Sequence, residues 1–434
     1  MLINTLKNSS RPTGRAAASL ANAAWIAAAL LGCVCTSASA QPATPFKLVP
    51  GTIPQLTPVV AHDARCVAQS DAHGLIAFGH DRTWPEGHIS LFKLDPSGQP
   101  ILPATTWKMP IPEGLVKQKL ENYPLSLAFH PTLPRLYVWQ EVNAYYTNPP
   151  SRETPELFTF DHLLIYDLAK SPPALVTALC RGPDWIYGQQ GGAIAIDGAG
   201  QFLYVPSLRE RTNAGSWRFG RFPLDADGLP KASSEAVSPL PPPEERIKKL
   251  EAANTAHTLL PPDLTPIEYV YLFPGGSYGS AISFLPQDKD LVIAGGSLGL
   301  ICWRPGDPLV VVSGLPIRKH GATLAARHPK LPLVFASKMQ GDAIFRTEFV
   351  EGYWTRVPRG WSFPESRLTT APVVLAKSNQ VAIGGQQQIY VVSLDDKGEA
   401  KPEAIVARAF SPAIKALTYS EKFDRLYVGV DLSR

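Results

Sequence analysis

The feature that most constrains the fold is internal repetition. A short run of alternating apolar residues, a polar turn and a second apolar run, often ending in Tyr-Val, recur along the chain. This pattern is typical of a β-hairpin, because successive side chains of a strand point to opposite faces. The four clearest copies are LSLAFHPTLPRLYVWQEV (125–142), GAIAIDGAGQFLYVPSLR (192–209), ATLAARHPKLPLVFASKM (322–339) and IKALTYSEKFDRLYVGVD (414–431).

Three weaker copies raise the number of predicted hairpins to seven: RCVAQSDAHGLIAFGHD (65–81), SAISFLPQDKDLVIAGGS (280–297) and PVVLAKSNQVAIGGQQ (372–387). The later copies follow one another at about 40–50 residues, the length of a four-stranded propeller blade. Third strands follow most hairpins, and fourth strands are predicted at 174–179, 309–312, 353–357 and 404–408. The sequence therefore predicts an all-β fold, a seven-bladed β-propeller.

The two ends of the chain are expected to pair. The last unit has only two strands before Arg434, and unpaired backbone groups on LYVGV (426–430) need partners. Residues 44–60 precede the first unit and belong to none. Their FKLV (46–49) and TPVV (57–60) runs are available to complete the last unit and close the ring, and their prolines suit an edge strand. With so little chain available, a three-stranded last blade is one expectation.

Residues 1–40 have the pattern of a signal peptide. Three basic residues precede a long apolar run, and small residues end the segment at Ala38 and Ala40. Cleavage after Ala40 would leave residues 41–434 as a single propeller domain, secreted or periplasmic. The alternative is an uncleaved N-terminal membrane anchor, since the apolar run is nearly long enough to span a bilayer. Two insertions, 142–162 and 225–266, lengthen the second and third units.

Charge and cysteine content narrow the possible partners. Without residues 1–40 the chain has 38 basic and 37 acidic residues, and this balance argues against a nucleic-acid surface. Three cysteines remain, Cys66, Cys180 and Cys302. Cys66 and Cys180 can form a bridge in an oxidising compartment, or all three can be buried thiols. No cysteine pair or histidine cluster indicates a metal or a cofactor.

Candidate ligand-binding residues are those at or before the first strand of each unit, because these positions converge on the channel of a propeller. The set is rich in basic and tyrosine side chains, which suit an anionic or carbonyl ligand. The competing interpretation is that these groups are solvated or paired with one another. The residues are His62, Asp63, Arg65, Tyr123, Tyr187, Tyr278, Arg318 and Lys415.

Two further histidines have a different interpretation. His130 and His328 stand before proline in the turn after a first strand, which predicts a structural role. Motifs for a catalytic serine elbow, a zinc protease, a P-loop or a dinucleotide site are absent from the sequence.

The Tyr-Val hairpins resemble the secreted YVTN-type and lactonase-like seven-bladed propellers. FHPTLPRLYVWQEV (129–142) is similar to that family's blade signature, in which Glu141 takes the place of the acidic residue. His320 precedes a first strand as the family's histidine does. The resemblance thus implies Glu141 and His320 as catalytic candidates. Where the family places an Arg-His pair before this blade, the chain reads YPLS (123–126).

The predicted function is therefore binding. We expect an exported scaffold for a small anionic ligand, a glycan or a protein partner. The alternative is a lactonase-like hydrolase of a cyclic ester, in which the basic channel polarises the carbonyl and Glu141 or His320 handles a proton or water. A redox propeller that holds a quinone or metal is a third option, which the scarcity of ligand clusters disfavours.

Overall fold

The computed structural model divides into two compact units, residues 1–40 and 41–434, and every described residue belongs to the second. The predicted signal peptide therefore lies outside the described residues. The described ranges are 43–61, 63–80, 87–110, 119–145, 157–181, 194–209, 216–231, 268–274, 282–284, 292–296, 299–303, 310–312, 323–338, 341–350, 353–354, 359–364, 366–408 and 414–430.

These ranges contain strands and turns, with no helix among them, and so no described helix could span a membrane. The first sheet comprises β4 (Ala64–Ser70), β5 (Leu75–His80), β6 (His88–Lys93) and β7 (Thr105–Lys108). The second comprises β8 (Lys119–Phe129), β9 (Arg135–Tyr145), β10 (Leu157–Asp167) and β11 (Ala174–Arg181). The third comprises β12 (Ala195–Ile196), β13 (Phe202–Arg209), β14 (Ser216–Pro223) and β15 (Glu268–Pro274). The fourth comprises β16 (Ile282–Phe284), β17 (Val292–Gly296), β18 (Gly299–Trp303) and β19 (Val310–Val312).

The remaining sheets combine the two ends of the chain. The fifth comprises β20 (Thr323–Arg327), β21 (Leu333–Lys338), β22 (Ala343–Val350), β23 (Tyr353–Trp354) and β24 (Arg359–Ser362). The sixth comprises β25 (Val373–Leu375), β26 (Gln380–Gly384), β27 (Gln388–Leu394) and β28 (Ala400–Arg408). The seventh comprises β29 (Leu417–Ser420) and β30 (Arg425–Val430). The N-terminal strands β1 (Thr44–Pro45), β2 (Lys47–Pro50) and β3 (Leu56–Val60) join the fifth, sixth and seventh sheets respectively.

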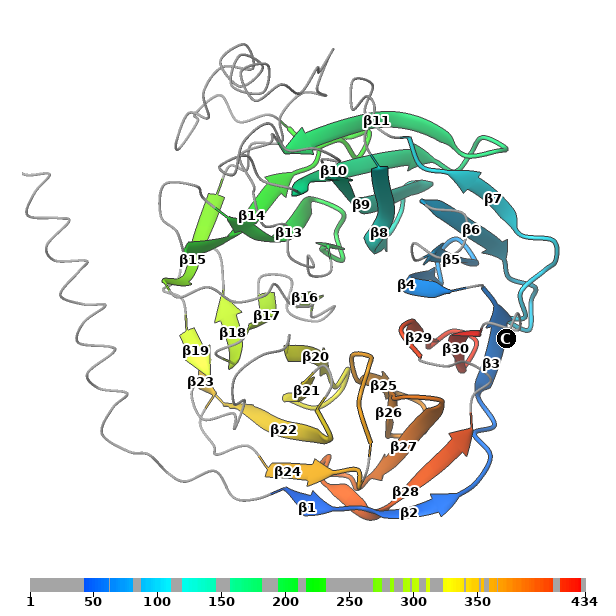
Figure 1. Ribbon diagram of the computed structural model, residues 1–434. Coiled ribbons are helices and arrows are strands. Elements are labelled where there is room, and N and C mark those ends of the chain that lie inside the picture. The colour runs from blue at the N-terminus through cyan, green and yellow to red at the C-terminus, as the bar shows by residue number, and fades with distance from the viewer. Residues whose placement is uncertain are drawn as a thin grey trace, which may run out of the picture. The chain divides into compact units, whose positions relative to one another are not determined.

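The sheets follow one another around a common centre, and within a sheet the chain steps outward from its first strand (Figure 1). All seven predicted hairpins are antiparallel strand pairs, which confirms the all-β prediction and the hairpin assignments. The fourth strand predicted at 353–357 is confirmed in part. Residues 353–354 form β23, which pairs antiparallel with the end of β22, and β24 pairs with the rest of β22.

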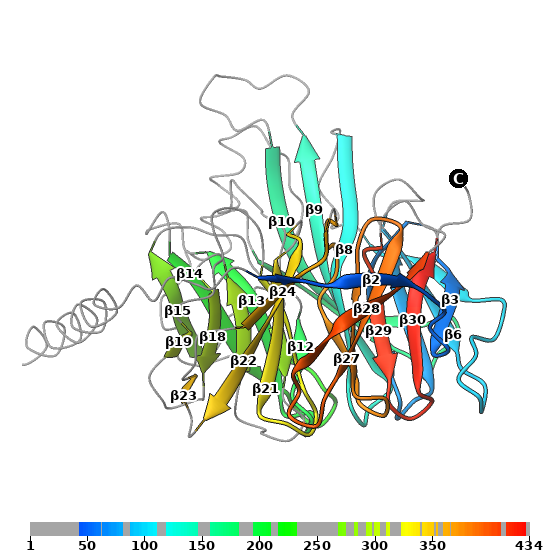
Figure 2. The same cartoon turned by 90° about the horizontal axis from the view of Figure 1, so that it is seen from below.

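The predicted pairing of the chain ends is confirmed by β3, which runs parallel to β30 and gives a three-stranded seventh sheet. The expectation that FKLV could also join this sheet is wrong. Residues 47–50 form β2, which pairs in parallel with β28 of the sixth sheet, and β1 pairs with β24 of the fifth. The segment 44–60, which we call the strap, therefore covers the outer edges of three successive sheets (Figures 1 and 2). Its three strand prolines are all exposed, as expected of an edge.

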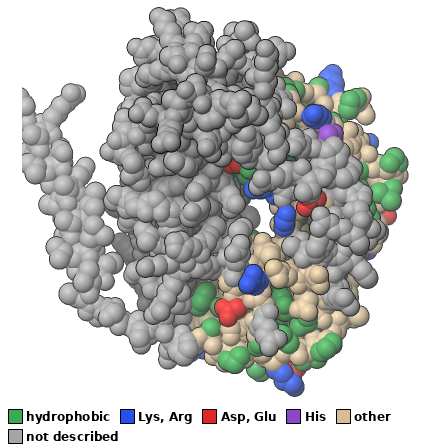
Figure 3. Space-filling view, in the orientation of Figure 1, with side chains coloured by type: hydrophobic (Ala, Val, Ile, Leu, Met, Phe, Trp, Pro, Cys, Tyr) green, Lys and Arg blue, Asp and Glu red, His purple; other side chains and the backbone are tan. Residues whose placement is uncertain are grey.

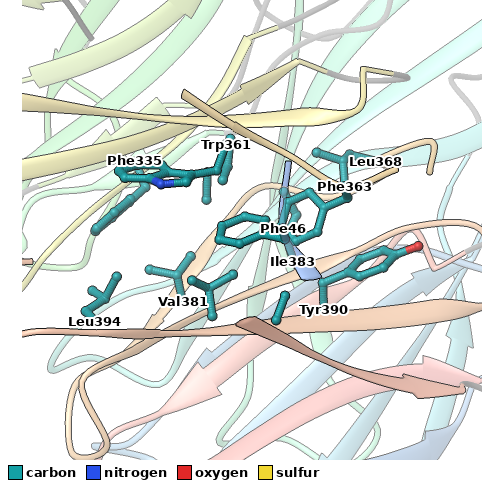
Figure 4. Packing of buried hydrophobic residues seen from close by; sticks show 12 residues of the cluster. Phe46, Phe335, Trp361, Phe363, Leu368, Val381, Ile383, Tyr390 and Leu394 are labelled. Atoms are coloured by element: carbon teal, nitrogen blue, oxygen red, sulfur yellow. The ribbon is translucent and has the colours of Figure 1, made fainter. Parts of the chain in front are cut away.

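We call the packed boundary between two adjacent sheets a seam. The strap inserts one apolar side chain into each seam that it crosses. Phe46 is 4% exposed and lies among Trp361, Phe363 and Tyr390 between the fifth and sixth sheets, with its ring centroid 4.9 Å from that of Phe363 (Figure 4). Ile53 and Val59 are buried in the same way in the next two seams. Each insertion removes apolar surface from water, so the strap holds these sheets together by burial as well as by backbone hydrogen bonds.

The tyrosine of the repeated Tyr-Val motif is hydrogen-bonded to the next sheet at two seams. Tyr427 Oη donates a hydrogen bond to the carbonyl of Gly98 in the next sheet at 2.7 Å, and Arg425 Nε donates to the carbonyl of Ser97 at 2.6 Å. Tyr137 donates to the carbonyl of Gly228 in the same way, and Arg135 Nε donates to the carbonyl of Asp227. Arg-Leu-Tyr in one sheet thus docks on the turn between the third and fourth strands of the next.

Those turns are built alike. An aspartate side chain accepts hydrogen bonds from the backbone N–H groups two and four residues later, and the glycine three residues later has a positive φ. This is the Asx-turn geometry expected when aspartate begins a turn that needs a left-handed residue. The three pairs are Asp95 with Gly98, Asp225 with Gly228 and Asp395 with Gly398.

The structural role predicted for the two His-Pro turns is confirmed. Nδ1 of His130 accepts hydrogen bonds from the backbone N–H groups of Thr132 and Leu133 at 3.2 and 3.0 Å, and Nδ1 of His328 accepts two equivalent bonds. The Nε2 atom of each ring bonds to the next sheet, at Gly200 and Asn379 respectively. Burial lowers the pKa of both imidazoles, so they remain neutral acceptors at Nδ1.

The end of β9 and the start of β10 lie within the predicted insertion 142–162. Register pairs continue without a break from Asp167 and Arg135 to Leu157 and Tyr145, and β8 follows β9 to the same end. The three strands extend beyond one face of the ring of sheets (Figure 2). Residues 146–156 of this insertion, and 232–266 of the second insertion, lie outside the described residues.

Candidate functional site

Three of the predicted site residues meet near the inner strands of the first two sheets. Arg65 lies on β4, Tyr123 on β8 and Glu141 on β9. Tyr123 and Glu141 are directly opposite each other in the antiparallel register, so their side chains share one face of the sheet. A register irregularity follows between Pro124 and Ser126, where the β8 chain enters the apolar part of the sheet.

The three side chains are layered. Glu141 is 2% exposed and Tyr123 is 3% exposed, and the Tyr123 hydroxyl donates a hydrogen bond to Glu141 Oε1. The Arg65 guanidinium carbon lies over the Tyr123 ring, 4.3 Å from its centroid. A guanidinium over a tyrosine face is held by a cation–π interaction, which is stronger where water is partly excluded. The carboxylate therefore fixes the tyrosine, and the tyrosine in turn positions the half-buried arginine.

A second charged pair lies at the neighbouring seam. Lys415 Nζ is 3.5 Å from Asp63 Oδ1, and their side chains are 40% and 22% exposed. Asp63 directly precedes β4 and has a φ of 47°, a left-handed conformation that aspartate tolerates better than most residues. Figure 3 shows basic and acidic side chains beside a central opening on the face drawn. The pair adds charge of both signs near the inner strands.

The other predicted site residues cannot be compared with the structure. His62, Tyr187, Tyr278, Arg318 and His320 lie outside the described residues. The described set therefore contains one of the two catalytic candidates, Glu141.

The described residues offer limited metal and thiol chemistry. Within the described ranges, no group of three or more His, Cys, Asp or Glu side chains is placed to hold a metal ion. Cys66 Sγ lies 3.8 Å from the carbonyl oxygen of Pro124. The side chains of Cys180 and Cys302 are outside the described part of the chain.

Sequence reasoning missed a buried polar row beside this cluster. Asn122, Gln140 and His162 are each at most 1% exposed and lie on neighbouring strands of the second sheet. Asn122 directly precedes Tyr123, and Gln140 directly precedes Glu141, so the row is on the opposite face of the same strands. The one available signal was the pair of polar residues that interrupts the apolar run in LYVWQEV (136–142).

The layered cluster places a guanidinium over a tyrosine that is held by a carboxylate. A guanidinium presents several N–H donors in one plane and can bind a carboxylate or phosphate through paired hydrogen bonds. Glu141 has almost no exposed surface and is already an acceptor for Tyr123. The described geometry thus places the arginine, and not the carboxylate, nearest to solvent.

Comparison with known proteins identifies a class of fold. The chain is similar in structure to a protein from Bacteroides fragilis NCTC 9343 described as a "putative 6-phosphogluconolactonase", with a TM-score of 0.51 and 12% identity over 82% of this chain and 86% of that one. The two proteins therefore share a fold. A protein described as functionally unknown, from Desulfotomaculum acetoxidans DSM 771, matches with a TM-score of 0.47 and 11% identity over 81% of this chain and 90% of that one. No family model and no curated protein matches the sequence.

Proposed function

We propose that the mature protein is an exported seven-bladed propeller that binds a small anionic ligand through Arg65. The observation that carries this proposal is the layered cluster, in which Glu141 holds Tyr123 and Tyr123 supports the guanidinium. An arginine whose position is fixed before binding loses less conformational entropy when a ligand arrives. Lys415, in its pair with Asp63, adds a second cation two residues before the neighbouring inner strand β29.

The binding test uses three probes, inorganic phosphate, gluconate and glucose. Isothermal titration should detect the two anions and not the neutral sugar. Arg65→Met keeps the apolar stem but removes the charge, and it should weaken anion binding by about tenfold or more, since a charge-assisted hydrogen bond contributes about 1.5–3 kcal/mol.

Arg359→Met is the matched control, because Arg359 lies on the outer strand β24 and its side chain is 67% exposed. This variant should bind the anions as the parent does. Equal affinity in the parent and Arg65→Met, or equal losses in both variants, would remove Arg65 from the site.

The second candidate function is hydrolysis of a cyclic ester. It is favoured by the lactonase-like fold of the Bacteroides fragilis protein and by the presence of Glu141 in the cluster. In that case Glu141 would act through Tyr123 or after a side-chain movement, with His320 as the second candidate. Acid release from a panel of sugar and aliphatic lactones distinguishes the two functions. Release that disappears in Glu141→Gln and His320→Ala would establish hydrolysis, and release no faster than background would favour binding alone.

Export is a separate part of the proposal. Expression of the full chain in a bacterial host, followed by fractionation and N-terminal sequencing, should yield a protein that begins at Gln41 outside the cytoplasm. A membrane-bound product that retains residues 1–40 would instead support the uncleaved anchor.

A further inference from the structure

The seam between the first and second sheets contains a row of buried polar side chains that the proposed ligand site does not use. Gln140 on β9 lies opposite His162 on β10 in the register, and Asn122 on β8 is hydrogen-bonded to Gln140. Gln140 and Asn122 are fully buried, and His162 is 1% exposed. Cross-strand neighbours on one face have Cβ atoms about 4.5–5.5 Å apart, so the three polar ends share one small region.

Two hydrogen bonds fix the orientation of the amides. Gln140 Nε2 donates to the carbonyl of Pro110 at 3.0 Å and to Asn122 Oδ1 at 2.6 Å. A carbonyl can only accept, so the nitrogen of Gln140 must face Pro110, and the oxygen of Asn122 must then face Gln140. The Asn122 amide also packs against the backbone at Gly87, where an added Cβ would come within 2.5 Å of Nδ2. The first sheet thus contacts the row through Gly87, which precedes β6, and Pro110, which follows β7.

Four polar atoms of the row have no hydrogen-bond partner among the described residues. They are Asn122 Nδ2, Gln140 Oε1, His162 Nδ1 and His162 Nε2. Burial lowers the pKa of His162 to about 3, so the ring is neutral and has one donor and one acceptor nitrogen. The unsatisfied groups are therefore a mixture of donors and acceptors. Leaving such groups unpaired in a protein interior is destabilising.

The balance of these groups identifies the kind of ligand. A cation would be repelled by the Asn122 amide N–H groups, and an anion would be repelled by Gln140 Oε1 and the acceptor nitrogen of His162. A neutral molecule that both donates and accepts satisfies all of them, and full burial of the row favours a very small one. Water has two donors and two acceptors, and buried waters typically bond to about three protein groups.

We propose that Asn122, Gln140 and His162 form a binding site for about one or two internal water molecules between the first two sheets. The bound water joins β8, β9 and β10 behind Tyr123 and Glu141, which lie on the other face of the first two of these strands. Asn122, Gln140 and His162 are positioning residues in this arrangement. The water site itself does not depend on whether Arg65 binds an anion.

Two measurements test the proposal. A crystal structure of the parent protein at high resolution should show solvent density within hydrogen-bond distance of at least two of the four atoms. Oxygen-17 relaxation dispersion counts long-lived internal waters in solution. His162→Met should lower that count by about one or two, because an apolar side chain of similar size removes both ring nitrogens.

Leu164→Met is the matched control, since Leu164 lies two residues away on the same face of β10 and is buried among apolar side chains. It should leave the water count unchanged. Absence of solvent density at the row, an unchanged count in His162→Met, or an equal decrease in both variants would overturn the proposal. If His162→Met fails to fold, the density in the parent protein decides alone. Anion titration of the same samples shows independently whether the Arg65 site is intact.

Discussion

Two seams of the ring are stabilised in opposite ways. The seam between the fifth and sixth sheets, which we call the strapped seam, is filled by apolar and aromatic side chains and is closed from outside by Phe46. The seam between the first two sheets, the polar seam, has an apolar part around Leu164 and Val138 and then a row of amide and imidazole groups. The polar seam also carries Tyr123 and Glu141 on the other face of its strands.

The comparison indicates how the chain divides stability and function. Apolar burial is non-directional and holds sheets together wherever surfaces fit. Buried polar groups stabilise a fold only when every donor and acceptor is satisfied, and they then fix a single arrangement of strands. The strapped seam therefore supports ring closure, whereas the polar seam is suited to holding side chains in defined positions. Four predictions test this division.

The largest effect is expected at the strapped seam. Phe46→Ala should lower the free energy of unfolding by about 3–5 kcal/mol, because it removes a buried ring and leaves a cavity beside Trp361 and Phe363. Lys47→Ala is the control. Its side chain is 73% exposed in an ion pair with Glu403, so the loss should be far smaller than that of Phe46→Ala. Urea unfolding of the two variants measures the difference, and similar losses would contradict the role given to the strap.

The turn that faces the strapped seam should be the next most sensitive position. Gly398 has a φ of 73°, and an added Cβ would lie 2.1 Å from Cδ1 of buried Leu333. Gly398→Ala combines backbone strain with overpacking and should cost about 2–3 kcal/mol. Gly74→Ala is matched, since Gly74 has a φ of 60° but open space around it, and should cost about 1 kcal/mol. Equal losses of stability in thermal unfolding would show that backbone strain, and not overpacking, determines the cost of both substitutions.

The polar seam should determine the response to acid. Burial lowers the pKa of His162 to about 3, below its usual value of 6.5 in the unfolded chain. The unfolded chain therefore binds a proton first as the pH falls below about 6.5, and stability is lost down to about pH 3, by at most ~1.4 kcal/mol per pH unit from this group.

His162→Met removes this contribution, while His130 and His328, whose pKa values burial also lowers, still titrate in the same direction. Urea midpoints measured from pH 7.5 to 4 should fall less steeply in the variant than in the parent. Parallel curves would show that the pKa of His162 is the same in the folded and unfolded states.

The sequence predicted the repeating framework because strand alternation and turn residues are local signals. The seven hairpins, the pairing of 57–60 with the C-terminal strand and the structural histidines could all be predicted in this way. The strap's crossing of three sheets could not, because FKLV can add to any exposed edge and only the ring decides which one lies beside it.

The candidate site was predictable only in part. Residues at the start of inner strands could be nominated by position, and Arg65, Tyr123 and Glu141 do meet. Which of the three side chains is buried and which is exposed depends on the strand register and on its irregularity after Pro124. The sequence does not reveal either. Asn122, Gln140 and His162 were missed because isolated polar residues in apolar strands look like exposed positions, and their burial results from packing between sheets that are distant in the chain.

The smallest expected effect concerns the hydroxyl that joins neighbouring sheets. Tyr137 Oη donates to the carbonyl of Gly228, and burial raises the pKa of the phenol, so it remains a donor throughout the accessible pH range. Phe335 occupies the same repeat position on β21, beside the strapped seam, where Leu333 packs against Gly398 instead. Tyr137→Phe removes the hydroxyl and leaves an aromatic ring like that of Phe335. It should lower the free energy of unfolding by about 1 kcal/mol, the net contribution of one hydrogen bond. Tyr427→Phe, which removes the bond to Gly98, should cost a similar amount, and a loss above about 3 kcal/mol in either variant would mean that the hydroxyl supports more than its own hydrogen bond.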